Sequence, residues 1–207
     1  MQYIFIHGLG QTPNSWDSVI KDIEIKEKVV CPDLSAFGEY GKSTYRGLYG
    51  EFSNLCRSFE EKLCICGISL GAVLALNYAI EHSEKIASLI LIAPQYKMPK
   101  LLLSFQQLLF HIMPRQCFQS AGLSKRDMIS LTASMKQLDF SKMLSMIRCP
   151  TLIVCGEKDR VNKKAAYKLA NRIESADLVL IEGTGHEVNK DNPRRLSHII
   201  SQQMSVQ

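Results

Sequence analysis

One segment constrains the fold of this chain more than any other, Gly67-Ile-Ser-Leu-Gly71. It fits the pattern G-x-S-x-G, with the apolar run Lys62–Cys66 before it and the helical pattern Ala72–His82 after it. On such a sharp strand-to-helix turn a serine hydroxyl stands clear of the sheet in a strained backbone. Glycines suit the flanking positions, because a β-carbon there would collide with the neighbouring helix or strand. We interpret Ser69 as a candidate nucleophile on a nucleophile elbow, the alternative being an ordinary glycine-rich turn.

Short apolar runs alternate with helical patterns along most of the chain, which predicts right-handed βαβ units and a mainly parallel sheet in an α/β three-layer sandwich. The continuous apolar character of the runs suits strands covered on both faces. The expected strands are Gln2–Ile6, Lys28–Cys31, Lys62–Cys66, Ile86–Ile92, Thr151–Cys155 and Leu178–Ile181. The expected helices are Ser15–Ile23, Leu48–Glu60, Leu70–Glu81, Lys163–Ile173 and Pro193–Gln203. Asn162 and Asn192 are the expected N-caps of the last two helices.

Strand signals vanish between about Gln95 and Met146, and helical spacing replaces them. We therefore expect residues 1–94 and 147–207 to form the core, and residues 95–146 to form an all-helical cap on the carboxyl edge of the sheet. The Leu, Met and Phe content of this segment fits plain packing. It fits equally a lid whose underside lines a substrate pocket, with methionine as an adaptable surface.

The length and charge of the chain are typical of an ordinary globular protein. The chain has 207 residues, enough for one domain with a substantial core, or one domain plus a small insertion. Its formal charge is +5, but the basic residues are scattered, and the densest pairs, Lys163-Lys164 and Arg194-Arg195, fall in expected helices. These pairs fit solvated helix faces, and no Lys/Arg stripe alternates with aromatic residues, so we expect no nucleic-acid partner.

The cysteines and the N-terminus bear on the compartment. The seven cysteines include no C-x-x-C pair, and most lie in apolar, strand-like runs. They fit small buried thiols in a reducing environment. The first residues lack the features of a signal peptide, and no apolar run is long enough to span a membrane. We therefore expect a cytoplasmic protein.

A serine nucleophile needs a base within hydrogen-bond reach, and the base needs an orienting acid. His186 lies just past an apolar strand, where the carboxyl edge of a sheet puts side chains in the crevice, and is the preferred base. The alternative is a loop histidine that satisfies a turn. His7 follows the first strand beside Gly8. Both are further candidates for residues of the pocket and its loop. Three histidines fall in expected helices, where surface or packing roles are usual: His82, His111 and His198.

Three carboxylates lie near the expected carboxyl edge of the sheet. Glu157 and Asp159 share the loop after the run Thr151–Cys155, and Asp33 follows the second expected strand. Spacing alone does not choose among them.

An oxyanion hole needs two backbone N–H groups aimed at the position where negative charge develops. Leu70, directly after Ser69, supplies one at the start of its helix. The loop His7-Gly8-Leu9-Gly10 offers the second, because small residues let its backbone approach a substrate carbonyl. We expect the Leu9 N–H to be that donor, although the glycines would also suit an ordinary turn.

Taken together, these pieces resemble the α/β-hydrolase superfamily over nearly the whole chain. The matching segments are Tyr3-Ile-Phe-Ile-His-Gly-Leu-Gly10, Cys31-Pro-Asp-Leu34, Gly67-Ile-Ser-Leu-Gly71, Leu91-Ile-Ala-Pro94, Gly156-Glu-Lys-Asp159 and Gly183-Thr-Gly-His186. The resemblance implies a catalytic triad in the chain order Ser69, Asp159, His186, with the acid on the last residue of Gly-x-x-Asp. It also supports Leu9 and Leu70 as oxyanion donors.

Two features depart from the family pattern. The chain opens on the strand that precedes the His-Gly loop, so we expect a compact sheet of about six strands that lacks the family's first two. The segment Ser35–Ser43 is longer than the usual loop after Pro-Asp-Leu, which leaves the shape of one pocket wall open.

The expected function is that of a serine hydrolase, a carboxylesterase-like enzyme that cleaves a small, mostly apolar acyl substrate through an acyl-enzyme. This chemistry needs no metal or organic cofactor. One alternative is a cofactor-free lyase or carbon–carbon bond hydrolase, in which His186 acts on a substrate proton. Another is a ligand-binding signalling protein with little turnover, because fold alone does not determine function. The substrate and the oligomeric state stay open.

Overall fold

The computed structural model describes residues 1–23, 25, 29–38, 44–114, 116, 118 and 124–205. Six strands form one sheet in the order β2-β1-β3-β4-β5-β6, and every neighbouring pair is parallel. The strands are β1 Gln2–Ile6, β2 Val29–Val30, β3 Leu63–Ile68, β4 Ile86–Ile92, β5 Thr151–Gly156 and β6 Ala176–Ile181. This α/β architecture with a six-stranded parallel sheet confirms the fold predicted from the alternating pattern.

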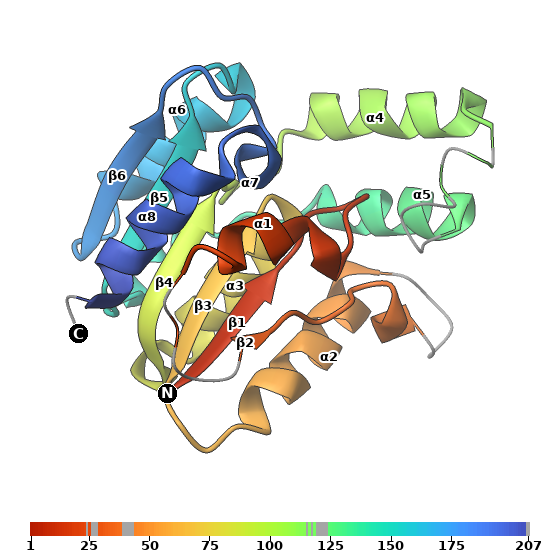
Figure 1. Cartoon of the computed structure of the whole chain (residues 1–207). Coiled ribbons are helices and arrows are strands. Elements are labelled where there is room, and N and C mark those ends of the chain that lie inside the picture. The colour runs from red at the N-terminus through yellow and green to blue at the C-terminus, as the bar shows by residue number, and fades with distance from the viewer. Residues whose placement is uncertain are drawn as a thin grey trace.

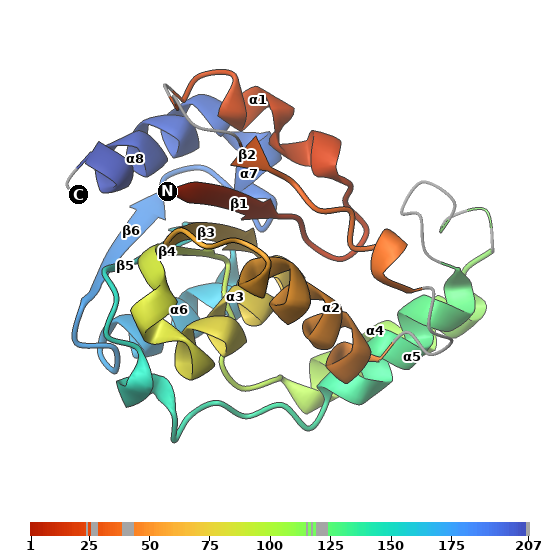
Figure 2. The same ribbon diagram turned by 90° about the horizontal axis from the view of Figure 1, so that it is seen from below.

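Helices cover both faces of the sheet (Figures 1 and 2). One face carries α2 Tyr45–Arg57, α3 Leu70–Glu81 and α6 Arg160–Ala170. The other carries α1 Asp17–Ile20, α7 Val188–Asp191 and α8 Pro193–Ser205. Short 3-10 helices span Pro13–Trp16, Ala36–Gly38, Ser83–Lys85 and Leu144–Met146. Among the described residues, no helix has the length and apolar character needed to cross a membrane.

The core consists of two apolar clusters, one on each face of the sheet. Ile4 and Ile6 pack toward α2 and α3, whereas Phe5 between them packs toward α1. Phe5 meets the fully buried Trp16 edge to face, with ring centroids 5.3 Å apart. Successive residues of a strand point to opposite faces, so a strand buried on both sides must be apolar at every position.

Several element boundaries match the sequence prediction and others shift. β1, β4 and α3 have the expected bounds, whereas β2 is shorter, and Lys28 of the expected strand lies outside the described residues. The first expected helix consists of a 3-10 turn followed by α1. α2 begins three residues early because Thr44 caps it, its Oγ1 accepting from the Gly47 N–H at 3.3 Å.

The two predicted N-caps have different outcomes. Asn162 was the wrong cap for α6, which begins at Arg160. Asp159 caps it instead, its Oδ1 accepting from the Asn162 N–H at 3.1 Å. A carboxylate is a strong N-cap and interacts favourably with the helix dipole. The prediction for Asn192 is confirmed, because its Oδ1 accepts from the Arg195 N–H at 3.2 Å in the first turn of α8.

The segment between β4 and β5 carries two longer helices, α4 Lys100–Ile112 and α5 Lys125–Met135, and projects beyond the sheet (Figure 1). They pack side by side, and the Gln107 Nε2 of α4 donates to the Ile129 carbonyl of α5 at 3.0 Å. The two stems of the segment are joined by an isolated antiparallel bridge between Lys97 and Asp139. The segment is therefore stabilised internally in two places, between its two stems and between α4 and α5.

Candidate active site

Ser69 stands on the turn between β3 and α3 in a backbone conformation that side chains rarely adopt, with φ 55° and ψ −112°. Its N–H donates to the Ile92 carbonyl at 2.9 Å, which ties the turn to β4. A β-carbon on Gly67 would overlap the Gly71 carbonyl, and one on Gly71 would overlap the Ile6 carbonyl. The two glycines therefore allow α3 to start against β1 and β3, which is the arrangement predicted for an elbow.

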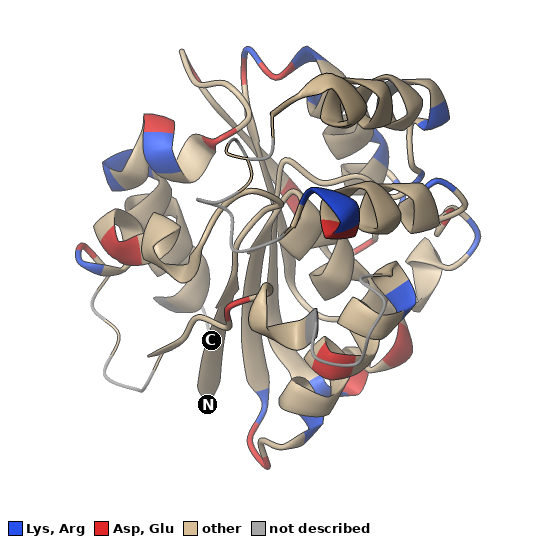
Figure 3. Cartoon of the chain, turned by 90° about the vertical axis from the view of Figure 1, so that its right-hand side faces the viewer, with Lys and Arg blue, Asp and Glu red and all other residues tan. Residues whose placement is uncertain are grey.

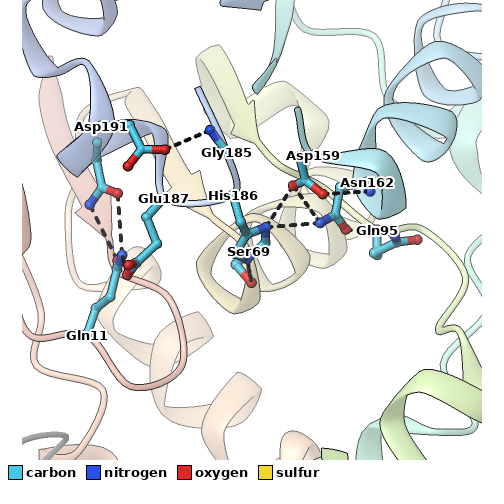
Figure 4. A network of polar contacts seen from close by, with 10 residues as sticks. Gln11, Ser69, Gln95, Asp159, Asn162, Gly185, His186, Glu187 and Asp191 are labelled. Carbon is cyan, nitrogen blue, oxygen red and sulfur yellow. Dashed lines mark hydrogen bonds and ion pairs between the residues drawn. The ribbon is translucent and has the colours of Figure 1, made fainter. Parts of the chain in front are cut away.

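His186 lies between Ser69 and Asp159 (Figure 4). Its Nε2 is 3.0 Å from Ser69 Oγ, and its Nδ1 is 2.8 Å from Asp159 Oδ2. The Asp159 side chain is 5% exposed and the His186 side chain 44%, so the acid is buried behind a histidine that reaches the solvent side. An ionised carboxylate can only accept, so Nδ1 carries the proton and Nε2 is free to accept from Ser69.

The surroundings of Asp159 favour its ionised form. Burial alone would raise the pKa of this carboxyl group, but hydrogen bonds from His186 and from the side chain and N–H of Asn162 outweigh burial and lower the pKa. The position at the N-terminus of α6 acts in the same direction. The acid is thus prepared to orient a histidine and to stabilise its charged form.

Two amide side chains that sequence reasoning missed complete this network (Figure 4). Asn162 Nδ2 donates to Asp159 Oδ2 at 2.8 Å, and its Oδ1 accepts from Gln95 Nε2 at 2.7 Å. Asn162 Nδ2 also lies 3.0 Å from His186 Nδ1. The available signal was the spacing of Asn162, three residues after Asp159 on a capped helix. Gln95 carried no such signal.

The loop that carries His186 is held by close backbone packing and a carboxylate. A β-carbon on Gly156 would overlap the Gly185 carbonyl, so glycine there lets the loop pass over the end of β5. Gly183 has a φ of 73°, which favours glycine. The Gly185 N–H donates to Asp191 Oδ2 at 2.7 Å, which anchors the loop to α7.

The other two candidate acids lie elsewhere. Glu157 Oε2 accepts from the Gly183 N–H at 3.0 Å and so supports the loop rather than the imidazole of His186. Asp33 Oδ1 accepts from the N–H and hydroxyl of Ser35 at 2.9 and 2.7 Å. Of the three carboxylates, Asp159 is the one hydrogen-bonded to His186.

His7 is buried and serves the backbone. Its Nδ1 donates to the Gly8 carbonyl at 2.9 Å, and its Nε2 accepts from the Leu34 N–H at 3.1 Å, so the neutral ring is fully used. Burial lowers the pKa of His7, although the Gly8 carbonyl and the charge of Asp33 partly oppose this. His7 therefore joins the loop after β1 to the loop after β2 and has no nitrogen left for chemistry.

Two backbone donors are available beside Ser69. Leu70 is the first residue of α3, whose N–H has no acceptor within the helix, and no hydrogen bond of the described residues uses the Leu9 N–H. Gln11 holds the Leu9 loop in place. Its Oε1 accepts from the Gly8 N–H at 3.1 Å, and its Nε2 donates to Glu187 Oε1 at 2.8 Å. The buried Gln11 thus connects this loop to the residue after His186.

A cavity of about 550 Å³ opens in front of these groups. It reaches Ser69, Leu70, Leu9, Asp159 and His186, and the rest of its wall is mostly apolar. The segment between β4 and β5 contributes Gln95, Met98, Pro99, Leu103, Phe105, Gln106, Leu109, Thr132 and Met135 to the lining. Of the long loop Ser35–Ser43, residues 39–43 lie outside the described part of the chain. Apolar walls with a few convergent polar groups are typical of small-molecule sites.

The sheet order and the strand–turn–helix at Ser69 define an α/β-hydrolase fold. The chain belongs to the Alpha/beta hydrolase family, whose family model matches residues 3–199.

Among curated proteins, a coelenterazine h 2-monooxygenase of Renilla reniformis is 34% identical over 95 residues, or 42% of this chain and 30% of that protein. Monoacylglycerol lipase ABHD6 of Homo sapiens is 20% identical over 246 aligned positions, which cover 95% of this chain and 73% of that protein. Among solved structures, one of carboxylesterases from the thaumarchaeon Nitrososphaera gargenis has a TM-score of 0.85 at 17% identity. That alignment covers 99% of this chain and 90% of the other. At this identity the likeness is one of fold.

Proposed function

We propose that this protein is a serine hydrolase that cleaves a small, mostly apolar ester or related acyl substrate through an acyl-enzyme. The observation that carries the proposal is the continuous hydrogen-bonded path from Asp159 through His186 to Ser69, which ends at an apolar cavity of about 550 Å³. A serine hydroxyl is a weak nucleophile, and a base with this geometry is what activates it.

The positions of these atoms support the following reaction. The substrate carbonyl enters the cavity beside Ser69, and His186 Nε2 takes the hydroxyl proton as Ser69 Oγ attacks the carbonyl carbon. The bond to the leaving alcohol then breaks, and the alcohol takes the proton that His186 returns. Water, activated by the same nitrogen, attacks the acyl-enzyme and releases the acid, which restores Ser69.

Negative charge on the carbonyl oxygen in the tetrahedral intermediate would be held by the N–H groups of Leu9 and Leu70. Both residues line the cavity, and both N–H groups are free of protein acceptors among the described residues. Each such donor contributes about 3–4 kcal/mol of transition-state stabilisation in enzymes of this kind.

We further propose that residues 95–146 act as a cap that selects the substrate and excludes water. Half of the cavity's lining residues come from this segment, among them Met98, Leu103 and Met135. Because these side chains are apolar, the acyl group that they accommodate would be apolar too.

A cytoplasmic location remains part of the proposal. The six described cysteines are free thiols, and burial raises the pKa of buried examples such as Cys155, to about 12. Unpaired buried thiols suit a reducing compartment.

The test is labelling of the purified protein with a fluorophosphonate, followed by mass spectrometry of the adduct, beside turnover of short p-nitrophenyl esters. We expect an adduct on Ser69 that blocks ester turnover, and loss of both in Ser69→Ala. A folded protein that forms no adduct and turns over no ester would overturn the acyl-transfer proposal. The lyase and ligand-receptor alternatives would then be the ones to test.

A further inference from the structure

Helix α4 presents an apolar face to solvent. Leu101, Phe105, Leu108 and Ile112 are 88%, 58%, 60% and 72% exposed. They are spaced four, three and four residues apart, so they lie along one side of the helix. With Leu109, α4 carries half of the ten exposed large apolar side chains among the described residues. A contiguous patch of this kind marks an interaction surface, whereas single exposed apolar residues do not.

The opposite face of α4 is already packed, so the exposed face does not result from a helix left undocked. Leu103 and Phe110 are each 9% exposed, and the Phe110 ring meets Phe118 edge to face at 5.5 Å. Gln107 bonds to the Ile129 carbonyl of α5. A water-facing helix normally buries its apolar side and exposes its polar side, but α4 is apolar on both.

The exposed face continues into the cavity. Phe105 and Leu109 are partly exposed, and both line the same cavity as Ser69. Val161, 48% exposed, lines the cavity from α6. Apolar side chains therefore extend from the outer side of α4 into the cavity that Ser69 lines.

The stretch of sequence that contains α4 carries charges of one sign. Between Glu84 and Asp127 the chain has six Lys or Arg residues and no Asp or Glu, whereas the rest has nineteen basic and twenty acidic residues. The basic residues are scattered along the sequence, but the acidic residues are excluded from this segment (charges coloured in Figure 3). Lys100 begins α4. Lys125 Nζ lies at the other end, where it donates to the His111 and Met113 carbonyls at 2.7 and 2.8 Å.

We propose that the apolar face of α4 docks on an anionic lipid surface. A helix with an exposed apolar face and cations nearby lies in the plane of a membrane interface, and anionic headgroups attract the cations. Docking would place the cavity mouth at Phe105 and Leu109 against the lipid, so that an acyl substrate passes into the cavity without crossing water. The docking stands on α4 alone, whereas the substrate transfer rests on the proposed function. A second copy of the chain fits less well, because two like-charged faces would meet.

The experiment is flotation of the full chain with vesicles of phosphatidylcholine and phosphatidylglycerol in a ratio of about 7:3, beside vesicles of phosphatidylcholine alone. The test variant combines Leu101→Ser, Leu108→Ser and Ile112→Ser, all exposed positions outside the cavity lining. The matched control combines Met146→Ser and Tyr167→Ser, exposed apolar positions 51% and 49% accessible on other elements. We expect the wild type and the control to bind anionic vesicles, less so at high salt, and the test variant to bind at least about tenfold more weakly.

Turnover of a short, water-soluble ester should be unchanged in the test variant, which would show that it is folded. Ser69→Ala should float like the wild type, so failed labelling with intact flotation would overturn the proposed function and leave the docking standing. Three results would overturn the docking: no flotation of the wild type, equal flotation with neutral vesicles, or a dimer in light scattering that the test variant converts to a monomer.

Discussion

Asn162 donates its side-chain amide to Asp159 Oδ2 at 2.8 Å, the same oxygen that accepts from His186. The oxygen is thus held from two directions, and Gln95 in turn holds the Asn162 carbonyl oxygen at 2.7 Å. A carboxylate with a fixed position transmits that position to the imidazole that it orients. Asn162 is therefore a positioning residue in the proposed mechanism, and Gln95 connects it to the segment that lines the cavity.

Replacement of Asn162 by alanine should lower kcat by about ten- to a hundredfold with little change in KM, because the acid loses one of its two side-chain donors. Without this donor the pKa of Asp159 rises, so activity should begin to fall at a higher pH on the acid side. Steady-state kinetics across the pH range measure both effects. Asn171→Ala, at the exposed other end of α6, is the matched control. Equal kcat values in the two variants would contradict the role.

Asp159→Asn should lower turnover by about 10⁴-fold, because an amide at this position favours the wrong histidine tautomer. Glu157→Gln should change turnover little, since Glu157 supports the Gly183 N–H and not the imidazole. Each substitution replaces one carboxylate oxygen by an amide nitrogen, and the two positions lie two residues apart. Turnover of p-nitrophenyl acetate compares them directly, and the reverse order of effects would show that the acid is misassigned.

Gln11→Met should weaken catalysis through the Leu9 loop. The variant leaves the buried Gly8 N–H without its acceptor and breaks the connection to Glu187. We expect a kcat at least about tenfold lower and a stability loss of about 1–3 kcal/mol. Asn14→Leu, which replaces an exposed amide in the 3-10 helix that follows the loop, should do neither. Wild-type kcat in Gln11→Met would rule out a contribution of Gln11 to the loop geometry.

Gly71→Ala should destabilise the fold by at least about 2 kcal/mol, because its β-carbon would overlap the Ile6 carbonyl and neither backbone can yield easily. In a chain of this size the midpoint of thermal unfolding would drop by about 4–8 °C. Gly50→Ala is the control, since nothing lies within 4 Å of its added β-carbon and alanine favours a helix interior. Thermal and urea unfolding of the pair give the comparison, and similar midpoints would contradict the close approach of α3 to β1.

His7 should make the fold less stable in weak acid. Burial lowers the pKa of His7 in the folded state, whereas the unfolded chain takes up the proton at about pH 6.5. The unfolded state therefore binds more protons as the pH falls from about 6.5 toward the folded pKa, and stability declines over that window. Urea unfolding at pH 7.5 and 5.0 should show a smaller decline in His7→Gln than in the wild type. An equal decline would assign this pH dependence to other groups.

The local patterns around Ser69 and His186 were sufficient to predict where each lies in the fold. A glycine-flanked serine after a buried run, and a histidine in a loop after another, both report backbone geometry that their immediate neighbours determine. The predicted N-cap of α6 was wrong, because Asp159 and Asn162 are equally good caps in isolation. In the structure Asp159 lies at the helix end, where its Oδ1 accepts from the Asn162 N–H.

The sequence by itself determined the succession of strands and helices along the chain and the parallel sheet, because short continuous apolar runs and helical spacing are both local patterns. Residue spacing left Glu157, Asp159 and Asp33 open as the acid, the family resemblance favoured Asp159, and the tertiary structure shows Asp159 in contact with His186. Only the tertiary structure decided that Gln11, Gln95 and Asn162 support the site. It also decided which apolar face of α4 is buried and which one is exposed to solvent. These contacts join residues far apart in the chain, so they depend on how the elements pack. A helix with apolar residues on two opposite sides carries no pattern that says which of the two is covered.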